Sequence, residues 1–383
     1  MANNVTAIEL SNDGIRVVTG YCYQDRLYII SAVKGEPLSL NQDGRISADE
    51  AVSSLTALLK YNNDISGINA GPFIVSIPPE NVEFKCGNSQ TGTVTSQISS
   101  IDYQNCVSIF TKENAVGGGT IISVMPNLFK DSNEMSYIEF PSGVTSSRLY
   151  LEADAVIVPT EAYEYYKGIL AKCGVFPYLY YISSLPPMAL IEKRVGDFSN
   201  YAILNIENRY TYLSVIREKK FAATKVFPYG IDTINNAAAA TMKVDPSKAA
   251  NMRHLFGFAS EQDIYRPYPD VKSVKSVNKA FAEGLSSLTE EIHSYLDSLS
   301  LPEMPIIMYG QSVDENGLST VLGNQLDLET FDFTQSIYGA FDQSYVGCLG
   351  MIYLSTLPYQ IPVQEAKSLQ HSEEMKNVSL GRK

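Results

Sequence analysis

Apolar and polar residues alternate in three short runs near the start of the chain. These runs span residues 5–10, 15–22 and 26–33, and polar turns separate them. Alternation with a period of two, broken by short polar turns, is typical of antiparallel strands joined as hairpins. From residue 48 to residue 59 the apolar positions recur every three or four residues, after Ser47 and Glu50, which have capping-box spacing. The first part of the chain therefore predicts three strands followed by a helix.

The same order of elements returns in the second half of the chain. Three more strands and two helices are predicted at residues 201–206, 211–216, 222–228, 232–242 and 274–299. The segment between the halves, residues 82–154, is rich in Ser, Thr, Asn and Gly and carries only short alternating runs. It predicts a small inserted α/β unit. The chain therefore contains a duplicated unit of three strands and a helix, with an insertion in the first copy.

Composition excludes several classes of protein. The 383 residues are 45% hydrophobic and 19% charged, which is typical of a folded chain with more than one domain. The net charge of −13 argues against binding to nucleic acid or to anionic membranes. Cysteines form no C-x-x-C pair and the histidines lie far apart, so we expect reduced thiols, a cytoplasmic protein and no metal site. Neither a signal peptide nor a membrane-spanning helix is expected.

Three segments carry a resemblance to a known family. Residues 119–183 contain a strand, a Met125-Pro126 turn, a Pro-Ser-Gly, a strand pair and a helix that ends in Cys-Gly. This order resembles the end of the inserted subdomain of FtsA, the actin-like protein of bacterial cell division. Residues 225–257 resemble the segment after its second phosphate loop, and "SYVGCLGMIYLS" resembles its final helix. PilM, the actin-like platform protein of type IV pili, is the second family that the first hairpin resembles.

The resemblance implies an α/β fold of the actin-like (duplicated ribonuclease H-like) type, with two lobes and an FtsA-type inserted subdomain. The expected divisions are lobe one at residues 1–82, 155–185 and 343–365, the insertion at 83–154, lobe two at 186–342 and a polar tail at 366–383. FtsA proteins typically end in an amphipathic membrane helix, and the polar tail has too few apolar residues for one. Either the protein lacks this anchor or the chain is truncated, and no direct membrane anchor is expected in this chain.

An actin-like nucleotide site needs acidic residues for Mg²⁺ and glycines that let backbone N–H groups approach the phosphates. The first hairpin keeps an acid as Glu9, whereas Ser11 stands at a usual glycine position. In the second hairpin Asn205 replaces the usual Asp, and Glu, Asn and Arg replace the glycines. The positions that correspond to the family's site are Glu9, Ser11, Asn12, Asn205, Glu207, Asn208, Arg209, Gly310, Gln311 and Ser312.

These replacements predict a degenerate nucleotide site. Side chains would fill the phosphate position, and Glu207 would repel an anion at short range. We therefore expect no cofactor, no ATPase activity and no catalytic residues. Two alternatives stay open: ATP with Mg²⁺ bound by a filament-forming FtsA homologue that anchors the division ring, and a phosphate held in another pose by Arg209 or Lys220.

The resemblance also implies a function and partners. We expect a non-enzymatic scaffold or assembly protein of the cell-division type, which self-associates and is recruited to the inner face of the membrane through its partners. The tubulin-like division protein would bind lobe two through Asp245, Asn251, Arg253, His254 and Phe256. A PilM-like pilus platform is the alternative, and it would bind a short peptide in the groove between lobe one and the insertion.

Residues 39–50 imitate a calcium-binding EF-hand loop. Asn41, Asp43 and Glu50 have ligand spacing, and Gly44 stands at the turn. However, the first ligand position is Ser39 rather than Asp, and the segment before the loop predicts a strand rather than a helix. We therefore interpret these residues as a loop that leads into the capped helix.

Overall fold

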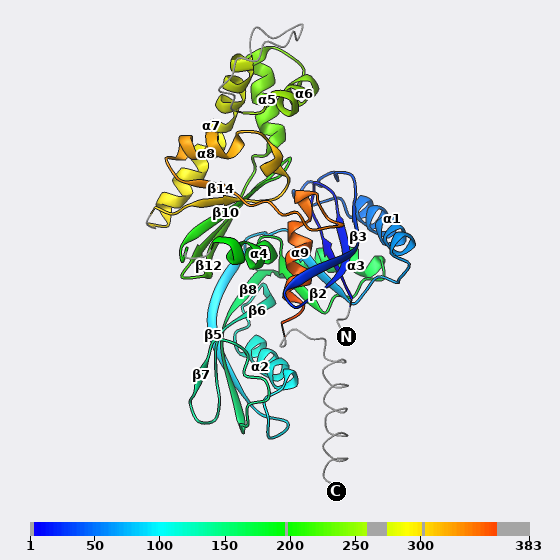
Figure 1. Ribbon diagram of the computed structural model, residues 1–383, viewed down its shortest axis with the longest axis vertical. Helices are drawn as coiled ribbons and strands as arrows, with labels where there is room; N and C mark the ends of the chain where they lie inside the picture. Colours follow the sequence, from blue (N-terminus) through cyan, green and yellow to red (C-terminus); the bar gives the residue numbers. More distant parts are fainter. Residues whose placement is uncertain (1–3, 196–197, 259–273, 301–302, 358–383) are drawn as a thin grey trace.

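The computed structural model describes residues 4–195, 198–258, 274–300 and 303–357. Within these residues the chain forms three β-sheets with helices packed against them (Figure 1). Two five-stranded sheets belong to the two lobes, and a four-stranded sheet belongs to the insertion, at the bottom of Figure 1. The expected polar tail and the part of the expected partner surface beyond residue 258 lie outside the described residues.

The sheet of lobe one has the strand order β3-β2-β1-β4-β9. Its strands are β1 (Val5–Glu9), β2 (Arg16–Tyr23), β3 (Arg26–Lys34), β4 (Phe73–Ile77) and β9 (Leu179–Ile182). β1 pairs antiparallel with β2, as the predicted hairpin requires, and parallel with β4. Because β1 lies in the middle of the sheet, every one of its residues is buried.

Helices cover both faces of this sheet. On one face lies α1 (Ala48–Ser66), whose buried Asn62 hydrogen-bonds Thr19 of β2 and Ser31 of β3. On the other face lies α9 (Val346–Leu354), whose Gly347 is next to the Glu9 carboxylate. Further along the chain, α3 (Thr160–Lys172) packs beside α1. Side chains alternate along β1, so Glu9 points toward α9 and the junction of the lobes.

The sheet of lobe two repeats this order as β12-β11-β10-β13-β14. Its strands are β10 (Tyr201–Ile206), β11 (Thr211–Arg217), β12 (Lys220–Phe227), β13 (Ile306–Met308) and β14 (Thr330–Asp332). β10 pairs antiparallel with β11 and parallel with β13, as β1 pairs with β2 and β4. The helices of this lobe are α5 (Ile231–Met242), α6 (Pro246–Phe256), α7 (Val274–Ser298) and α8 (Leu318–Leu326). The duplicated α/β architecture is therefore present.

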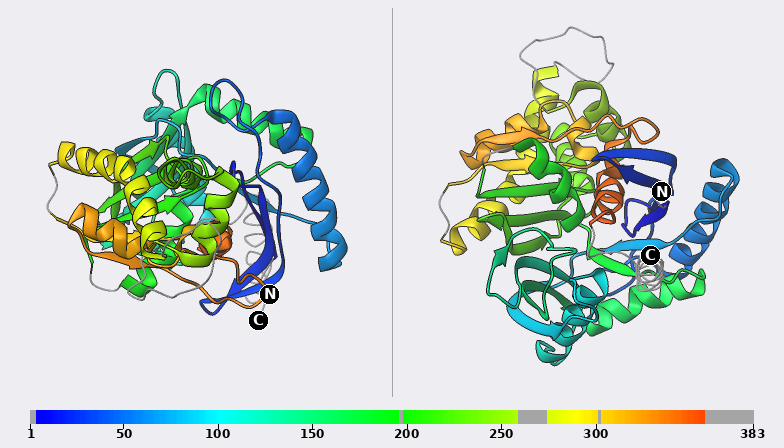
Figure 2. Two further views of the ribbon diagram at one scale, coloured as in Figure 1. Left: turned by 90° about the horizontal axis from the view of Figure 1, so that it is seen from above. Right: turned by 60° about the horizontal axis from the view of Figure 1, so that its bottom comes forward.

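The insertion is a separate layer with its own apolar core. Its sheet order is β5-β8-β6-β7, and its elements are β5 (Glu83–Gly92), α2 (Ser100–Glu113), β6 (Gly119–Lys130), β7 (Ser136–Tyr137) and β8 (Arg148–Pro159). β8 extends beyond residue 154, the expected end of the insertion, because it stays paired with both β5 and β6 as far as Ile157. In the right-hand view of Figure 2 the bottom of the molecule in Figure 1 is turned forward, so this sheet faces the reader.

Two helices lie at the junction of the lobes, where α4 (Leu185–Val195) packs against α9 (Figure 1). The Pro186-Pro187 pair, which we interpret from sequence as a domain boundary, stands in the first turn of α4. Proline is tolerated there because the first N–H groups of a helix have no partner within it. The two helices α4 and α9 approach each other closely, because a Cβ on Gly350 of α9 would lie 2.1 Å from the Pro186 carbonyl oxygen.

Candidate functional site

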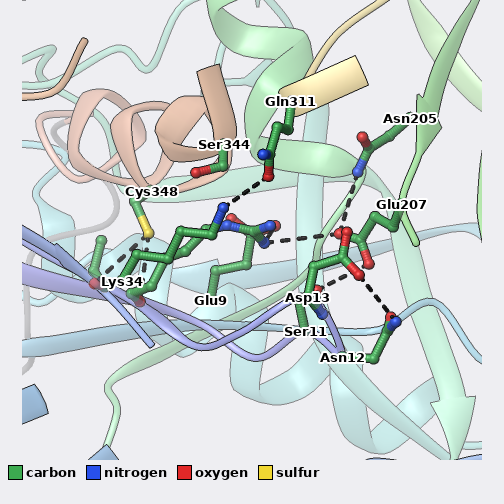
Figure 3. Close-up of polar contacts among 12 residues, drawn as sticks. Glu9, Ser11, Asn12, Asp13, Lys34, Asn205, Glu207, Gln311, Ser344 and Cys348 are labelled. Atoms are coloured by element: carbon green, nitrogen blue, oxygen red, sulfur yellow. Dashed lines mark hydrogen bonds and ion pairs between the residues drawn. The ribbon is translucent and has the colours of Figure 1, made fainter. Parts of the chain in front are cut away.

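Two hairpin turns from the two lobes meet at the junction (Figure 3). The first turn, residues 10–15, joins β1 to β2, and the second turn, residues 207–210, joins β10 to β11. The Asn208 backbone N–H donates to both carboxylate oxygens of Asp13, at 3.0 and 2.9 Å. The Ser11 hydroxyl donates to Glu207 Oε2 at 2.9 Å. The two turns therefore bind each other directly through side chains.

Charged groups behind the turns are buried. Arg16 lies between Glu9 and Glu207, with a nitrogen-to-oxygen distance of 3.7 Å to each carboxylate. Burial opposes the charge on Arg16, but the carboxylates of Glu9, Glu207 and Asp13 outweigh it and raise the pKa of its guanidinium. These ion pairs are long, and the Glu9 Oε2 and Arg16 Nε atoms have no hydrogen-bond partner in the described part of the chain.

Burial raises the pKa values of the acidic side chains at this junction. The pKa of Glu207 is raised to about 8, first by burial and then by the Asp13 carboxylate, although Arg16 lowers it. Burial is also the main cause of the raised pKa values of Glu9 and Asp13. At neutral pH Glu207 is therefore largely a neutral acid, which reduces the repulsion among the three acidic groups.

A third contact joins the lobes beside the turns. Lys34 of β3 donates from Nζ to Gln311 Oε1 at 2.8 Å, and Gln311 begins the short 3₁₀ helix η1 (Gln311–Asp314). Burial, followed by the nearby Arg16 charge, lowers the pKa of Lys34. Figure 3 shows Lys34 between Glu9 and Gln311.

The turn before η1 approaches the second hairpin closely. Gly310 has φ +83°, and a Cβ at this residue would lie 2.3 Å from Asn205 Oδ1. Asn205 in turn donates from Nδ2 to Glu207 Oε1 at 3.4 Å. Glycine is therefore required at position 310 both for the backbone conformation and for space.

The structure places nine of the ten expected nucleotide-site residues in or beside this junction. Arg209 differs, because its side chain is exposed at the tip of the second turn. Sequence reasoning missed Asp13, Arg16 and Lys34, which make the contacts between the lobes. For Arg16 a local signal was available, because a charged residue at the start of an otherwise apolar strand is unusual in a buried sheet.

The expected partner-binding residues on α6 and just before it divide into two groups. Asp245, Asn251 and His254 are exposed. Arg253 is buried, donates from Nε to Asn235 Oδ1 at 3.1 Å and forms an ion pair with Glu315. Phe256 is also buried, in the core of lobe two. The expectation is therefore corrected for Arg253 and Phe256, because the amphipathic α6 turns both toward the core.

The loop that imitates an EF-hand uses its polar groups internally. Asn41 Oδ1 accepts from the backbone N–H groups of Asp43 and Arg45, at 2.9 and 3.0 Å. Glu50 Oε2 accepts from the Ser39 N–H at 2.8 Å. Throughout the described ranges, no group of three or more His, Cys, Asp or Glu side chains could hold a metal ion.

No family model and no curated protein matches the sequence. Among solved structures, the chain is similar to the "PilM-PilN type IV pilus biogenesis complex", with a TM-score of 0.60, 14% identity and coverage of 92% of this chain and 99% of that chain. The chain has an actin-like fold.

Two further solved structures support this assignment. The ethanolamine utilization protein EutJ from Carboxydothermus hydrogenoformans has a TM-score of 0.53 and 12% identity, with coverage of 92% of this chain and 89% of that chain. MreB5 of Spiroplasma citri bound to ADP has a TM-score of 0.53 and 9% identity, with coverage of 96% and 98%. Identities this low establish the actin-like fold alone. Among the described helices, none is both long enough and apolar enough to span a membrane.

Proposed function

We propose that this chain is a non-enzymatic, actin-like scaffold protein whose phosphate-loop hairpins bind each other in place of a nucleotide. The observation that supports the proposal is the pair of hydrogen bonds from the Asn208 N–H to the Asp13 carboxylate. Backbone N–H groups in such turns are the donors that bind phosphate in nucleotide-binding proteins. Here a carboxylate of the protein itself accepts from that donor.

Electrostatics also favours the proposal. A phosphate that reached the Asn208 N–H would have to displace Asp13 and would approach the side chains of Glu207 and Glu9. All three acids are at least nine-tenths buried, so little solvent screens a phosphate from those that are ionised, whereas Glu207, largely neutral at pH 7, adds little to this repulsion. Arg16 does not compensate, because it already lies between Glu9 and Glu207.

Calorimetric titration with Mg-ATP tests the proposal. We expect no heat of binding from the natural protein. The variant with Asp13 changed to Ala and with Glu207, Asn208 and Arg209 all changed to Gly should recover weak binding, because it removes the carboxylate that occupies the backbone N–H at position 208 and the side chains of the turn. Its matched control replaces Glu218 and Lys219, the left-handed residues of the exposed β11–β12 turn, with Gly. Micromolar binding of Mg-ATP by the natural protein would overturn the proposal and favour a nucleotide-regulated filament former.

For the cellular role, we propose a scaffold of the cell-division type that binds the tubulin-like division protein through lobe two. The resemblance of three sequence segments to FtsA supports this role. Exposed residues near and on α6, Asp245, Asn251 and His254, form the proposed contact. Changing all three to Ala should abolish pull-down of the division protein. If the variant still pulls down the division protein and its circular dichroism is unchanged, this role is ruled out.

A pilus-type platform is the second candidate, and two observations favour it. One is the likeness to the PilM–PilN complex over almost the whole of both chains. The other is a cavity of about 450 Å³, lined by β6 of the insertion, by α4 and by the start of β12. A short peptide from a PilN-type partner would bind there. Titration with that partner's N-terminal peptide separates the two roles, and Met188→Trp, which narrows the cavity, should weaken binding only in the pilus-type case.

A further inference from the structure

Strand β5 forms one edge of the sheet in the insertion. In the described part of the chain it pairs only with β8, and its ten residues pair without a bulge. Directly after the strand, the Thr93 N–H donates to the carbonyl oxygen of Ser147, the residue opposite, at 3.2 Å. Residues that exchange hydrogen bonds alternate along an antiparallel pair. The N–H and C=O groups of the even-numbered residues from 84 to 92 therefore point away from β8.

Most of this outward edge is open. Cys86, Asn88 and Gln90 are exposed, and no hydrogen bond to another described residue occupies their N–H and C=O groups. At the start of the strand, the Phe84 ring stacks on Phe221 of β12, with centroids 5.5 Å apart, so lobe two covers that end. In Figure 1 β5 starts next to β12 and runs down into the insertion. The open part, residues 86–92, is the β5 edge.

The other sheet edges among the described residues are shielded from an added strand in ways that proteins commonly use. β7 and β14 are only two and three residues long. β12 carries the exposed charges of Lys220 and Lys225, and β9 packs against β6. The loop before α9 lies on β3, where a Cβ on Gly339 would be 3.3 Å from Ile29 Cβ. The β5 edge has none of these protections, since its sequence, CGNSQTG, contains neither a charge nor a proline.

The β5 edge is complementary to itself. Two identical edges can pair antiparallel across a two-fold axis, so that each contact is made twice. With the axis at Asn88, the middle one of the three open residues, Asn88 faces its own copy and Cys86 of each copy faces Gln90 of the other. Each of these pairs exchanges two backbone hydrogen bonds. Lys85, the charge nearest to the edge within β5, then lies opposite Thr91, so no like charges meet.

We propose that two copies of this chain form a dimer through their β5 edges, which joins the two insertion sheets into one continuous antiparallel sheet. One pair of strands is a small interface, so we expect a dissociation constant in the micromolar range. The inference assigns a surface to the self-association that the sequence analysis expects. It goes beyond the scaffold role and depends neither on the nucleotide site nor on either proposed partner.

Sedimentation velocity of the full chain tests the proposal. We expect a monomer–dimer equilibrium between about 1 and about 100 µM, at about 150 mM salt, which screens the repulsion between two chains of net charge −13. Asn88→Pro should raise the dissociation constant at least about ten-fold, because proline removes an outward N–H and leaves the bonds to β8 intact. Asn88→Lys should have a similar effect, because it places two like charges at the axis.

The matched control is Ser108→Lys on the exposed face of α2, which adds the same charge to the insertion and should leave the dissociation constant unchanged. A monomer at every concentration would overturn the proposal and leave the edge to a strand of another protein. A dimer that neither Asn88 variant weakens would also overturn it, because the copies would then meet elsewhere. Circular dichroism shows whether each variant folds, and if Asn88→Pro does not fold, Asn88→Lys decides.

Oxidative cross-linking tests the register of the pair. In a Cys86→Ser background, Asn88→Cys places one thiol of each copy at the axis, where the expected Cα–Cα separation of about 5.5 Å suits a disulfide. Non-reducing electrophoresis should show a cross-linked dimer for this variant. Lys112→Cys in the same background, at an exposed position of α2, is the control and should show none. Equal cross-linking of the two variants would contradict pairing through the β5 edge.

Discussion

The backbone N–H of Asn208 donates to both carboxylate oxygens of Asp13, at 3.0 and 2.9 Å, although the two residues are 195 positions apart. Asp13, labelled in Figure 3, lies in the turn between β1 and β2 of lobe one, and Asn208 lies in the matching turn between β10 and β11 of lobe two. A carboxylate that accepts from a backbone N–H forms a charge-assisted hydrogen bond. This bond, together with Ser11–Glu207, joins the two lobes directly at their junction.

Asp13→Ala should lower the free energy of unfolding by about 1–3 kcal/mol, because it leaves the Asn208 N–H without its acceptor. Urea denaturation followed by circular dichroism measures the change. The matched control is Asp64→Ala on the exposed face of α1, which should change stability by less than about 0.5 kcal/mol. Equal effects of the two variants would mean that the contact between the turns contributes no stability.

Stability should fall as the pH rises from about 5 to about 8. The folded-state pKa of Glu207 is raised from 4.5 to about 8, so between these values the folded chain binds a proton that the unfolded chain has lost. The free energy of unfolding then decreases by up to about 1.4 kcal/mol per pH unit from this residue, and the dependence ends above pH 8. The raised pKa values of Glu9 and Asp13 act in the same direction.

Glu207→Gln should reduce this slope, since the amide does not titrate and still accepts from the Ser11 hydroxyl. Urea midpoints at several pH values between 5 and 8, for the natural chain and the variant, measure the difference. Identical slopes in the two proteins would show that Glu207 titrates near its ordinary value. Glu218→Gln, in an exposed turn, is the control and should leave the slope unchanged.

Gly310→Ala should destabilise the fold by about 1–3 kcal/mol, because the residue has a left-handed backbone and little space. The new methyl group would meet the Asn205 amide, which supports Glu207. Gly117→Ala is the matched control, since a Cβ at Gly117 meets nothing within 4 Å. Thermal unfolding compares the two variants. A Gly310→Ala protein as stable as the Gly117→Ala protein would contradict the close approach of the turn before η1 to Asn205.

Gly350→Ala should also destabilise the chain, by about 1–3 kcal/mol, because a methyl group would force α9 away from α4. The Cβ would lie 2.1 Å from the Pro186 carbonyl oxygen. Gly168→Ala on the exposed side of α3 should instead stabilise by about 0.5–1 kcal/mol, since nothing lies within 4 Å and alanine favours a helix. Urea denaturation of the two variants measures whether each substitution lowers or raises the free energy of unfolding. A stabilising Gly350→Ala would show that α4 and α9 are not packed this closely.

Much of the architecture could be predicted from local patterns. The period-two runs predict both hairpins, and the helical spacing predicts α1, α5 and α7, because burial of one face leaves a periodic trace in the sequence. The sequence analysis did not predict α4, although Pro186 and Pro187 occupy its first turn, where proline is tolerated. Tertiary context decided the orientation of Arg253 and Phe256 on α6.

For the candidate site, too, the sequence determined one part and the tertiary structure decided the rest. The sequence by itself determined that acidic, amide and arginine side chains stand in the second turn, because residue type at a turn position can be read along the chain. That these positions correspond to the aspartate and glycines of a nucleotide site is what the resemblance to FtsA predicts. Only the tertiary structure decided that Asp13 accepts from Asn208, that Arg16 lies between Glu9 and Glu207, and that Lys34 contacts Gln311. These partners are far apart in the sequence, and hydrogen bonds and charge interactions depend on distances of a few ångströms that only the packing of the two lobes sets.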